Sequence, residues 1–345
     1  MPRLLVVDLA SSSRNWALPP EGERRIRDSA PEGWDVRVVS APTVSDGDGN
    51  ARPSDEAMEA IASAEAYVGF GIGRPLFAAA RSLRWIHSAA AGVGSALFPE
   101  LVRSDVLFTN SAGVHAVPIA EHVAGGVLYL IRGFDIAVDQ HRAGRWDKAP
   151  FVNGGVIREL GECRVLIVGA GGLGVEIARR LACFGAQVTG IRRRPELGVP
   201  SGFERVIGPD PAELERALGE ADILVLAAPQ TSGTERLIGR ERLARLPAGA
   251  IVVNVARGAL LDEEALADAV EDGRLRGAVL DVFGEEPLPP TSRLWRSPSI
   301  LLTPHVSAVS PGGFWRRELD LFIDNWRRFV RGGPLRNLVD KQAGY

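Results

Sequence analysis

The sequence contains little of what marks several large classes of protein. It has only two cysteines in 345 residues, Cys163 and Cys183, and their spacing matches neither a metal site nor a redox motif. We therefore expect buried, reduced thiols rather than a disulfide framework, and no metal. No apolar run approaches the 18 residues that a membrane-spanning helix needs. The net charge of −3 gives no sign of a nucleic-acid-binding surface.

The N-terminal segment MPRLLVVDLASSS is too short, and too acidic at Asp8, for a signal peptide. We expect a soluble protein of the cytoplasm that binds neither membranes nor nucleic acid. The apolar fraction of 46% and the charged fraction of 24% are ordinary for a globular protein. Because a domain typically takes about 150 residues, the length suggests two domains.

The stretch from 163 to 194 carries the clearest motif. Residues 164–168, RVLIV, form a short apolar run rich in β-branched side chains, which predicts a buried strand. A glycine-rich turn follows, then apolar residues at helical spacing until Gly185, and then a second strand at 186–191. This strand–turn–helix–strand order is typical of a unit that binds a dinucleotide.

The glycines of this turn, Gly169, Gly171 and Gly174, have the spacing G-x-G-x-x-G. In dinucleotide-binding folds the first glycine makes the tight turn, the second lets the backbone approach the pyrophosphate, and the third allows close helix–strand packing. The N–H groups at the helix start, which include those of Gly172 and Leu173, face the phosphates. We predict a dinucleotide site here; the alternative is a plain structural turn.

Short strands and helices alternate along the rest of the chain. We expect further strands at 4–9, 34–40, 66–70, 85–89, 106–109, 223–228, 250–255, 277–282 and 300–303. We expect helices at 55–66 with Ser54 as N-cap, 76–82, 95–102, 116–132, 134–146, 259–272 and 313–330, and loops at 41–53 and 147–155. Near-continuous apolar strands belong to parallel sheets covered on both faces, so the fold class is α/β.

The helix at 116–132, AVPIAEHVAGGVLYLIR, is apolar on more than one face. Pro118 lies in its first turn, where proline is tolerated. We expect this helix either to cross between domains or to support a subunit interface.

In open parallel sheets, ligands bind beyond the carboxyl ends of the strands. That rule singles out the glycine turn, 229–234, Arg257, Glu286 and His305. Histidine is suited to proton transfer near neutral pH, a carboxylate can orient the imidazole, and an arginine fork suits a substrate carboxylate. Each also has a structural alternative: a hydrogen-bonded loop histidine, a solvated glutamate and an ion-paired arginine.

The sequence resembles the D-isomer-specific 2-hydroxyacid dehydrogenase family over nearly its whole length. The matching motifs are GAGGLG, VNVARGALLDEEAL after Pro229-Gln230-Thr231, LDVFGEEPL, TPHVS and the C-terminal GGPLRNLVD. The resemblance implies two doubly wound, Rossmann-like domains with parallel sheets. A dinucleotide-binding domain, 114–307, would be inserted into a substrate domain formed by 1–113 and 308–345.

The resemblance also implies roles for the strand-end residues. Arg257 would bind the substrate carboxylate and carbonyl, His305 would be the general acid/base, and Glu286 would pair with His305. The backbone N–H groups of the loop Ala90-Ala91-Gly92, in particular those of Ala91 and Gly92, would also hold the carboxylate. Members of the family are typically homodimers, here through the region 116–146.

For the cofactor, the resemblance implies that Asp281 contacts the nicotinamide carboxamide. The remaining residues expected at the cofactor are Pro229, Thr234, Val255, Ala256 and Ala308.

Two positions depart from the family pattern. Where NAD-preferring members carry an acidic residue for the ribose hydroxyls, this chain has Arg192, Arg193 and Arg194. Because arginine attracts a 2′-phosphate, we expect a preference for NADPH over NADH, the alternative being a solvated basic turn with NAD used. The usual Gly-x-Asp after the carboxylate loop is Gly92-Val93-Gly94 here, which leaves the substrate open.

Together these patterns predict an NAD(P)-dependent D-2-hydroxyacid dehydrogenase that reduces a 2-keto acid. Glyoxylate, hydroxypyruvate and bulkier keto acids all fit the sequence. The alternative is a catalytically silent, dinucleotide-binding regulatory protein of the same fold. Formate dehydrogenases look similar but carry an amide where Glu286 stands, whereas phosphite dehydrogenases keep all three residues.

Overall fold

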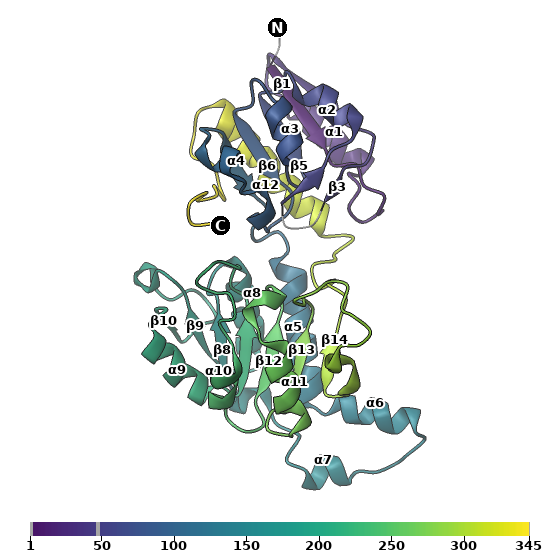
Figure 1. Ribbon diagram of the computed structural model, residues 1–345, viewed down its shortest axis with the longest axis vertical. Coiled ribbons are helices and arrows are strands. Elements are labelled where there is room, and N and C mark those ends of the chain that lie inside the picture. Colours follow the sequence, from purple (N-terminus) through teal and green to yellow (C-terminus); the bar gives the residue numbers. More distant parts are fainter. Residues whose placement is uncertain (1–2, 46–48, 345) are drawn as a thin grey trace. The chain divides into compact units, whose positions relative to one another are not determined.

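The computed structural model describes residues 3–45 and 49–344. The chain divides into two compact units. One is formed by both chain ends, Met1–His115 with Val309–Tyr345, and the other by Ala116–Ala308. Each unit is built around a parallel sheet (Figure 1). The predicted α/β architecture with two parallel sheets is therefore confirmed.

The unit formed by the chain ends has a five-stranded sheet in the order β2-β1-β5-β6-β7 and a two-stranded β3-β4 hairpin. Its elements are β1 (Arg3–Asp8), α1 (Pro20–Asp28), β2 (Trp34–Val38), β3 (Val44–Ser45), β4 (Ala51–Arg52), α2 (Asp55–Ile61), β5 (Ala66–Gly69), α3 (Arg74–Ala79), β6 (Trp85–Ser88), the 3₁₀ turn η1 (Gly94–Ala96), α4 (Pro99–Arg103), β7 (Leu107–Asn110) and α12 (Phe314–Val330).

Successive side chains of a strand point to opposite faces, so this sheet has two apolar cores. Leu5 and Val7 of β1 pack with α1 and α12, while Val6 between them packs with α2 and α3. The C-terminal helix α12 thus covers one face of a sheet whose strands all come from the N-terminal part of the chain.

The second unit has a seven-stranded parallel sheet in the order β10-β9-β8-β11-β12-β13-β14. Its elements are α5 (Ala116–Ile131), α6 (Phe134–Arg142), α7 (Ala149–Asn153), η2 (Leu160–Glu162), β8 (Arg164–Val168), α8 (Gly172–Cys183), β9 (Gln187–Ile191), η3 (Pro195–Leu197), β10 (Arg205–Ile207), α9 (Pro211–Glu220), β11 (Ile223–Leu226), α10 (Arg240–Arg245), β12 (Ile251–Asn254), η4 (Gly258–Leu260), α11 (Glu263–Glu271), β13 (Gly277–Leu280), η5 (Arg293–Arg296) and β14 (Ile300–Leu302).

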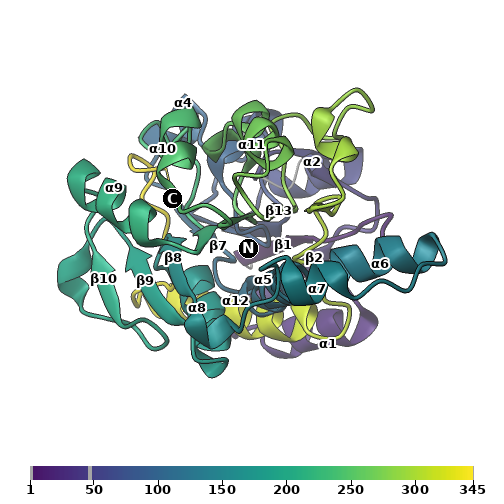
Figure 2. The same ribbon diagram turned by 90° about the horizontal axis from the view of Figure 1, so that it is seen from below.

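Helices cover both faces of this sheet, as in a doubly wound fold. Helices α5 and α8 pack on one face and α9, α10 and α11 on the other (Figure 2). Gly126 lets α5 approach the sheet, because a Cβ at this position would lie 2.6 Å from Cγ1 of Val279 on β13. In this unit α5 is a buried sheet-covering helix, which explains why its sequence is apolar on several faces.

Helices α6 and α7 extend away from the rest of this unit (Figure 1). The base of this arm is fixed by a bidentate ion pair: Arg276 Nη1 and Nη2 donate to the two carboxylate oxygens of Asp135, at 2.9 and 2.6 Å. The arm also exposes apolar side chains, with Phe134 53%, Trp146 98% and Val152 70% exposed.

Several expectations about local structure need correction. The expected loop 147–155 contains the one-turn helix α7, and the expected loop 41–53 contains β3 and β4; its residues 46–48 lie outside the described residues. The helix expected from residue 259 is a 3₁₀ turn followed by α11, because the Asp262 side chain caps the N–H of Ala265. Cys183 is exposed, so only Cys163 has the expected burial.

The predicted N-cap at Ser54 is confirmed, since its hydroxyl accepts the N–H of Ala57. Across the ranges 3–45 and 49–344, every helix is too short or too polar to cross a membrane.

Candidate functional site

The glycine turn between β8 and α8 has the backbone that its sequence predicts. Gly169 has φ of +112°, and a Cβ there would lie 2.6 Å from the carbonyl carbon of Ala227 on the neighbouring strand. A Cβ on Gly174 would collide with the carbonyl oxygen of Gly169, so this position holds the helix against the turn. Both positions therefore exclude any residue larger than glycine.

Gly171 differs from the other two glycines. Open space surrounds it, with nothing within 4 Å of an added Cβ, and it is the N-cap of the 12-residue helix α8. The first N–H groups of a helix have no partner within the helix and lie at its positive dipole end. A pyrophosphate group therefore fits here on three grounds: open space, free donors and favourable charge.

The arginines after β9 are placed differently from one another. Arg192 is half-buried and donates from Nη2 to the carbonyl oxygen of Gly198 at 2.7 Å. Arg193 and Arg194 are exposed at the carboxyl end of β9, next to the strand that leads into the glycine turn.

His305 and Glu286 form a hydrogen-bonded pair. His305 Nδ1 lies 2.8 Å from Glu286 Oε2, while Glu286 Oε1 accepts the N–H of Phe283 at 2.9 Å. With both oxygens engaged, the carboxylate is held in place, and it favours the imidazole form that carries a proton on Nδ1. The imidazole is 46% exposed, so its other nitrogen can face a ligand.

Asp281, which follows β13, fixes the turn that carries His305. The carboxylate is buried, and its Oδ1 accepts the Thr303 hydroxyl at 2.6 Å and the N–H of Val306 at 2.9 Å. Its Oδ2 accepts the N–H of Ser307 at 2.9 Å. One side chain thus accepts three hydrogen bonds from residues on either side of His305, whose own φ is +51°.

Arg257 follows β12, and its segment packs against the loop that carries Glu286. A Cβ on Gly258 would collide with the backbone of Phe283, so only glycine allows this contact. Asn254 holds the segment by donating from Nδ2 to the carbonyl oxygen of Arg257 at 3.0 Å. The structure therefore brings the loops of all three predicted catalytic residues together at the carboxyl ends of β12, β13 and β14.

The other expected cofactor residues lie at the same sheet edge. Thr234 closes the turn after β11, with its hydroxyl donating to the carbonyl oxygen of Pro229 at 2.7 Å. Val255 and Ala256 are buried directly after β12, and Ala308 is half-buried at the end of the His305 turn.

In the other unit, the loop after β6 presents backbone donors. Its two carbonyl groups are occupied: the Ala90 oxygen accepts the N–H of Ser111 at 3.1 Å, and the Ala91 oxygen accepts Nδ2 of Asn110 at 2.8 Å. In a planar trans peptide the N–H points opposite to the C=O, so the N–H groups of Ala91 and Gly92 point away from these partners.

Neither N–H has a hydrogen-bond partner in the part of the chain that the structure describes, and both residues are partly exposed. Two adjacent free donors form a cradle suited to a carboxylate. Asn110 and Ser111, which shape it, were not predicted, although Asn110 ends β7 and Ser111 follows it, so the strand-end rule would have found them.

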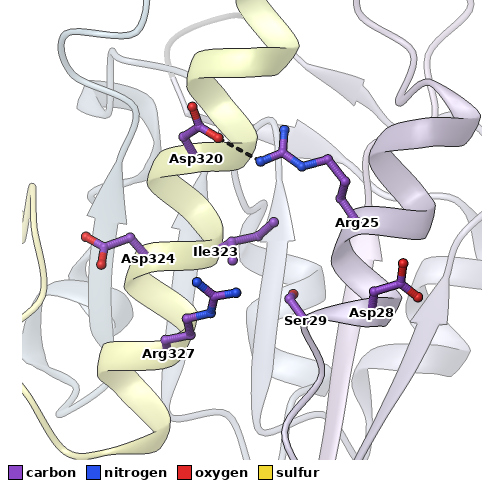
Figure 3. Close-up of a pocket in the computed structure, with 7 residues that line it drawn as sticks. All are labelled: Arg25, Asp28, Ser29, Asp320, Ile323, Asp324 and Arg327. Atoms are coloured by element: carbon purple, nitrogen blue, oxygen red, sulfur yellow. Dashed lines mark hydrogen bonds and ion pairs between the residues drawn. The ribbon is translucent and has the colours of Figure 1, made fainter.

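A separate groove of about 320 Å³ lies between α1 and α12 (Figure 3). Its lining residues are Arg25, Asp28, Ser29, Asp320, Ile323, Asp324 and Arg327. Opposite charges lie side by side here, with Arg25 Nη2 2.7 Å from Asp320 Oδ1.

A dinucleotide turn and a carboxylate-oriented histidine at the same sheet edge define a class of protein. That class is the dinucleotide-dependent oxidoreductases, which need a side chain able to move a proton beside the cofactor. Comparison with known proteins identifies the family within this class. The chain belongs to the D-isomer specific 2-hydroxyacid dehydrogenase family, whose NAD binding domain matches residues 124–307. Its members are oxidoreductases that act on 2-hydroxy acids with a nicotinamide cofactor.

Glyoxylate/hydroxypyruvate reductase A of Salmonella typhi is 33% identical over 273 residues, which are 77% of this chain and 83% of that protein. The D-isomer specific 2-hydroxyacid dehydrogenase of Xanthobacter autotrophicus, solved with NADPH and MES, is 30% identical over all of both chains with a TM-score of 0.78.

A third similar protein is the NADPH-dependent glyoxylate/hydroxypyruvate reductase of Sinorhizobium meliloti, solved with NADP and sulfate. It is 28% identical, with 99% of this chain and 100% of that chain covered and a TM-score of 0.77. The predicted family and fold are thus confirmed.

Proposed function

We propose that this protein is a reductase of small 2-keto acids that prefers NADPH. The observation that carries the proposal is the His305–Glu286 pair, which provides an oriented proton donor at the sheet edge where the dinucleotide turn lies. The named activity of the Salmonella and Sinorhizobium relatives makes glyoxylate and hydroxypyruvate the first substrates to test.

The residues divide the chemical work. We assign substrate binding to the N–H groups of Ala91 and Gly92 in one unit and to the guanidinium of Arg257 in the other, because each of these groups suits a carboxylate. Glu286 accepts a hydrogen bond from Nδ1–H of His305 and orients the ring, so that Nε2 of the protonated imidazole donates a proton to the substrate carbonyl oxygen. A bound nicotinamide cofactor would supply the hydride that reduces the carbonyl group.

The cofactor itself is held by the glycine turn and by residues at the neighbouring strand ends. Gly169, Gly171 and Gly174, with the N–H groups of 172–174, would hold the pyrophosphate, and Asp281 is the residue proposed for the nicotinamide carboxamide. We assign dinucleotide binding to 114–307 and substrate binding to 1–113 with 308–345, which the two compact units support.

His305→Ala tests the proton-transfer role. We expect kcat for glyoxylate or hydroxypyruvate to fall roughly 10²–10⁴-fold, with little change in the KM for NADPH, because the imidazole acts on the substrate oxygen. Glu286→Gln, which keeps the size of the side chain, is the matched variant and should lower kcat by less. Turnover by His305→Ala at the wild-type rate would remove this residue from the mechanism.

We assign the cofactor preference to Arg193 and Arg194, whose side chains are exposed, whereas Arg192 is half-buried and donates to the carbonyl oxygen of Gly198. Exposed arginines at the end of β9 suit a ribose 2′-phosphate, and the Xanthobacter and Sinorhizobium structures contain NADPH and NADP. Replacing both residues by Ala should raise the KM for NADPH and leave that for NADH unchanged. Arg205→Ala, a surface arginine on β10, is the control.

Wild-type kcat/KM should be higher with NADPH than with NADH. The opposite preference would contradict the assignment of the arginines to a 2′-phosphate.

We further propose that the chain forms a homodimer through 116–146. The arm formed by α6 and α7 exposes Phe134 and Trp146, and a partner would cover these side chains. Light scattering after size-exclusion chromatography should give twice the chain mass of 36.9 kDa, and Trp146→Asp should shift it toward the monomer. A monomeric wild type would contradict this proposal.

A cytoplasmic location is supported by two free cysteines, since disulfides are rare in that compartment. The alternative of a silent regulatory protein is not favoured, because the relatives are reductases and the His305–Glu286 pair is formed.

A further inference from the structure

The unit formed by the chain ends contains a buried polar cluster that the proposed chemistry does not use. Its centre is His87 on β6, with no exposed surface, and Glu318 on α12, which is 1% exposed. His87 Nε2 lies 3.2 Å from Glu318 Oε1, and His87 Nδ1 lies 2.8 Å from the hydroxyl oxygen of Thr109 on β7.

The cluster extends directly to the end of β7. Ser111, also fully buried, lies with its Oγ 2.6 Å from Glu318 Oε2 and 2.9 Å from the carbonyl oxygen of Ser88. Every polar atom of Glu318 and His87 therefore has a partner. A buried carboxylate is strongly unfavourable unless it is satisfied in this way, so the cluster has one well-defined arrangement.

Ser111 is also the residue that holds the carboxylate loop. Its backbone N–H donates to the carbonyl oxygen of Ala90, while its side chain is fixed by Glu318. The hydroxyl of Ser88 accepts the N–H of Ala90 at 3.3 Å from the other side. The peptide between Ala90 and Ala91 is thus tied at its carbonyl end to a residue that α12 anchors.

We propose that Glu318, His87 and Ser111 are positioning residues that set the direction of the free N–H groups of Ala91 and Gly92. Because the peptide is planar, the Ser111 contact at the Ala90 oxygen fixes the direction of the Ala91 N–H. Movement of Ser111 rotates this donor away from a bound carboxylate. The inference rests on the proposed function, since it assigns the cradle to the carboxylate of a 2-keto acid.

The test compares Glu318→Gln and Ser111→Ala with the wild type in steady-state kinetics. Both variants should raise the KM for the preferred keto acid roughly tenfold or more, because small misplacements of binding groups have large effects. The KM for NADPH should stay within twofold, and inhibition by oxamate, a keto-acid analogue with a carboxylate, should weaken in parallel.

Tyr67→Phe is the matched control. It removes a buried hydroxyl from β5 of the same sheet, where the hydroxyl donates to Asp8 at 2.8 Å, and it should leave the KM for the keto acid unchanged. Ser111→Ala removes a single oxygen and guards against misfolding of the glutamine variant; circular dichroism verifies the fold of each.

An active wild type with an unchanged keto-acid KM in both variants would overturn the inference alone. The same holds if the KM values for keto acid and NADPH rise together, as general destabilisation would cause. Absence of turnover by the wild type on any keto acid would refute the proposed function and this inference with it.

Discussion

Replacing Asp281 by Asn tests whether this carboxylate holds the turn that carries His305. The native side chain accepts three hydrogen bonds, from the Thr303 hydroxyl and from the N–H groups of Val306 and Ser307. An amide has one oxygen and one NH₂ group, so it can keep the Oδ1 contacts. At the Oδ2 position it then places a donor against the N–H of Ser307.

The expected loss of stability follows from the number of hydrogen bonds that the amide cannot make. One charge-assisted hydrogen bond is lost, and the N–H of Ser307, a residue only 6% exposed, is left without an acceptor. Together with weaker contacts at the remaining oxygen, this amounts to about 2–4 kcal/mol of unfolding free energy. For a domain of 150–250 residues, that corresponds to a decrease in Tm of roughly 5–15 °C.

The assay combines thermal unfolding with kinetics. We expect Asp281→Asn to lower both Tm and kcat, whereas His305→Ala, which leaves the carboxylate contacts in place, should lower kcat with little change in Tm. If Asp281→Asn unfolds at the wild-type temperature with wild-type kcat, the carboxylate does not fix the turn, and this reasoning is refuted.

Three further predictions concern stability. Gly126→Val should destabilise the protein by about 1–3 kcal/mol or more, because the introduced side chain would overlap Val279. Urea denaturation measures this loss, and an unchanged midpoint would contradict the close packing of α5 on the sheet. Arg276→Met should lower the free energy of unfolding by about 3–5 kcal/mol, since it leaves the carboxylate of Asp135, 3% exposed, without its partner. Equal Tm values for variant and wild type would contradict the role of this ion pair in fixing the arm. Burial raises the pKa of Asp8, so the charged form is disfavoured in the folded state and stability is lost as the pH rises from the ordinary value of 3.8 through the raised pKa. Asp8→Asn should therefore gain stability relative to the wild type between pH 4 and pH 8 in thermal unfolding, and a difference that is the same at both pH values would count against the raised pKa.

The central strands could be predicted because a parallel strand covered on both faces is apolar along its whole length. The run 164–168 matches β8 at both ends, and the run 223–228 extends only two residues beyond β11. Two missed helices had readable signals. The segment that forms α9 begins with Asp210-Pro211, an N-cap followed by a proline at the first position, and α1 begins with Pro20.

Helix α7 has only five residues, Ala149–Asn153, and gives no periodicity to read. Within the candidate site, too, the sequence predicts only those features that depend on neighbouring residues or on the ends of strands. The glycine turn is visible in the sequence because each glycine meets a local requirement of the backbone. From the rule that ligands bind beyond the carboxyl ends of parallel strands, we predict Arg257, Glu286 and His305 at one edge of the sheet, and the structure places their loops together.

The groups that orient those residues could not be read from the sequence, because their partners are far apart in the chain. His87 and Glu318 are 231 positions apart, and Glu318 lies on a helix whose polar residues otherwise suggest a solvated face. Asp281 resembles a cofactor contact in its motif, while its oxygens hold a turn some 22 to 26 positions further on. A motif thus records which side chain meets the ligand, but the direction of that side chain depends on buried hydrogen bonds that only the folded chain creates. For this reason, substitutions at Asp281 and Glu318, rather than at the motif glycines, separate the positioning of the site from its chemistry.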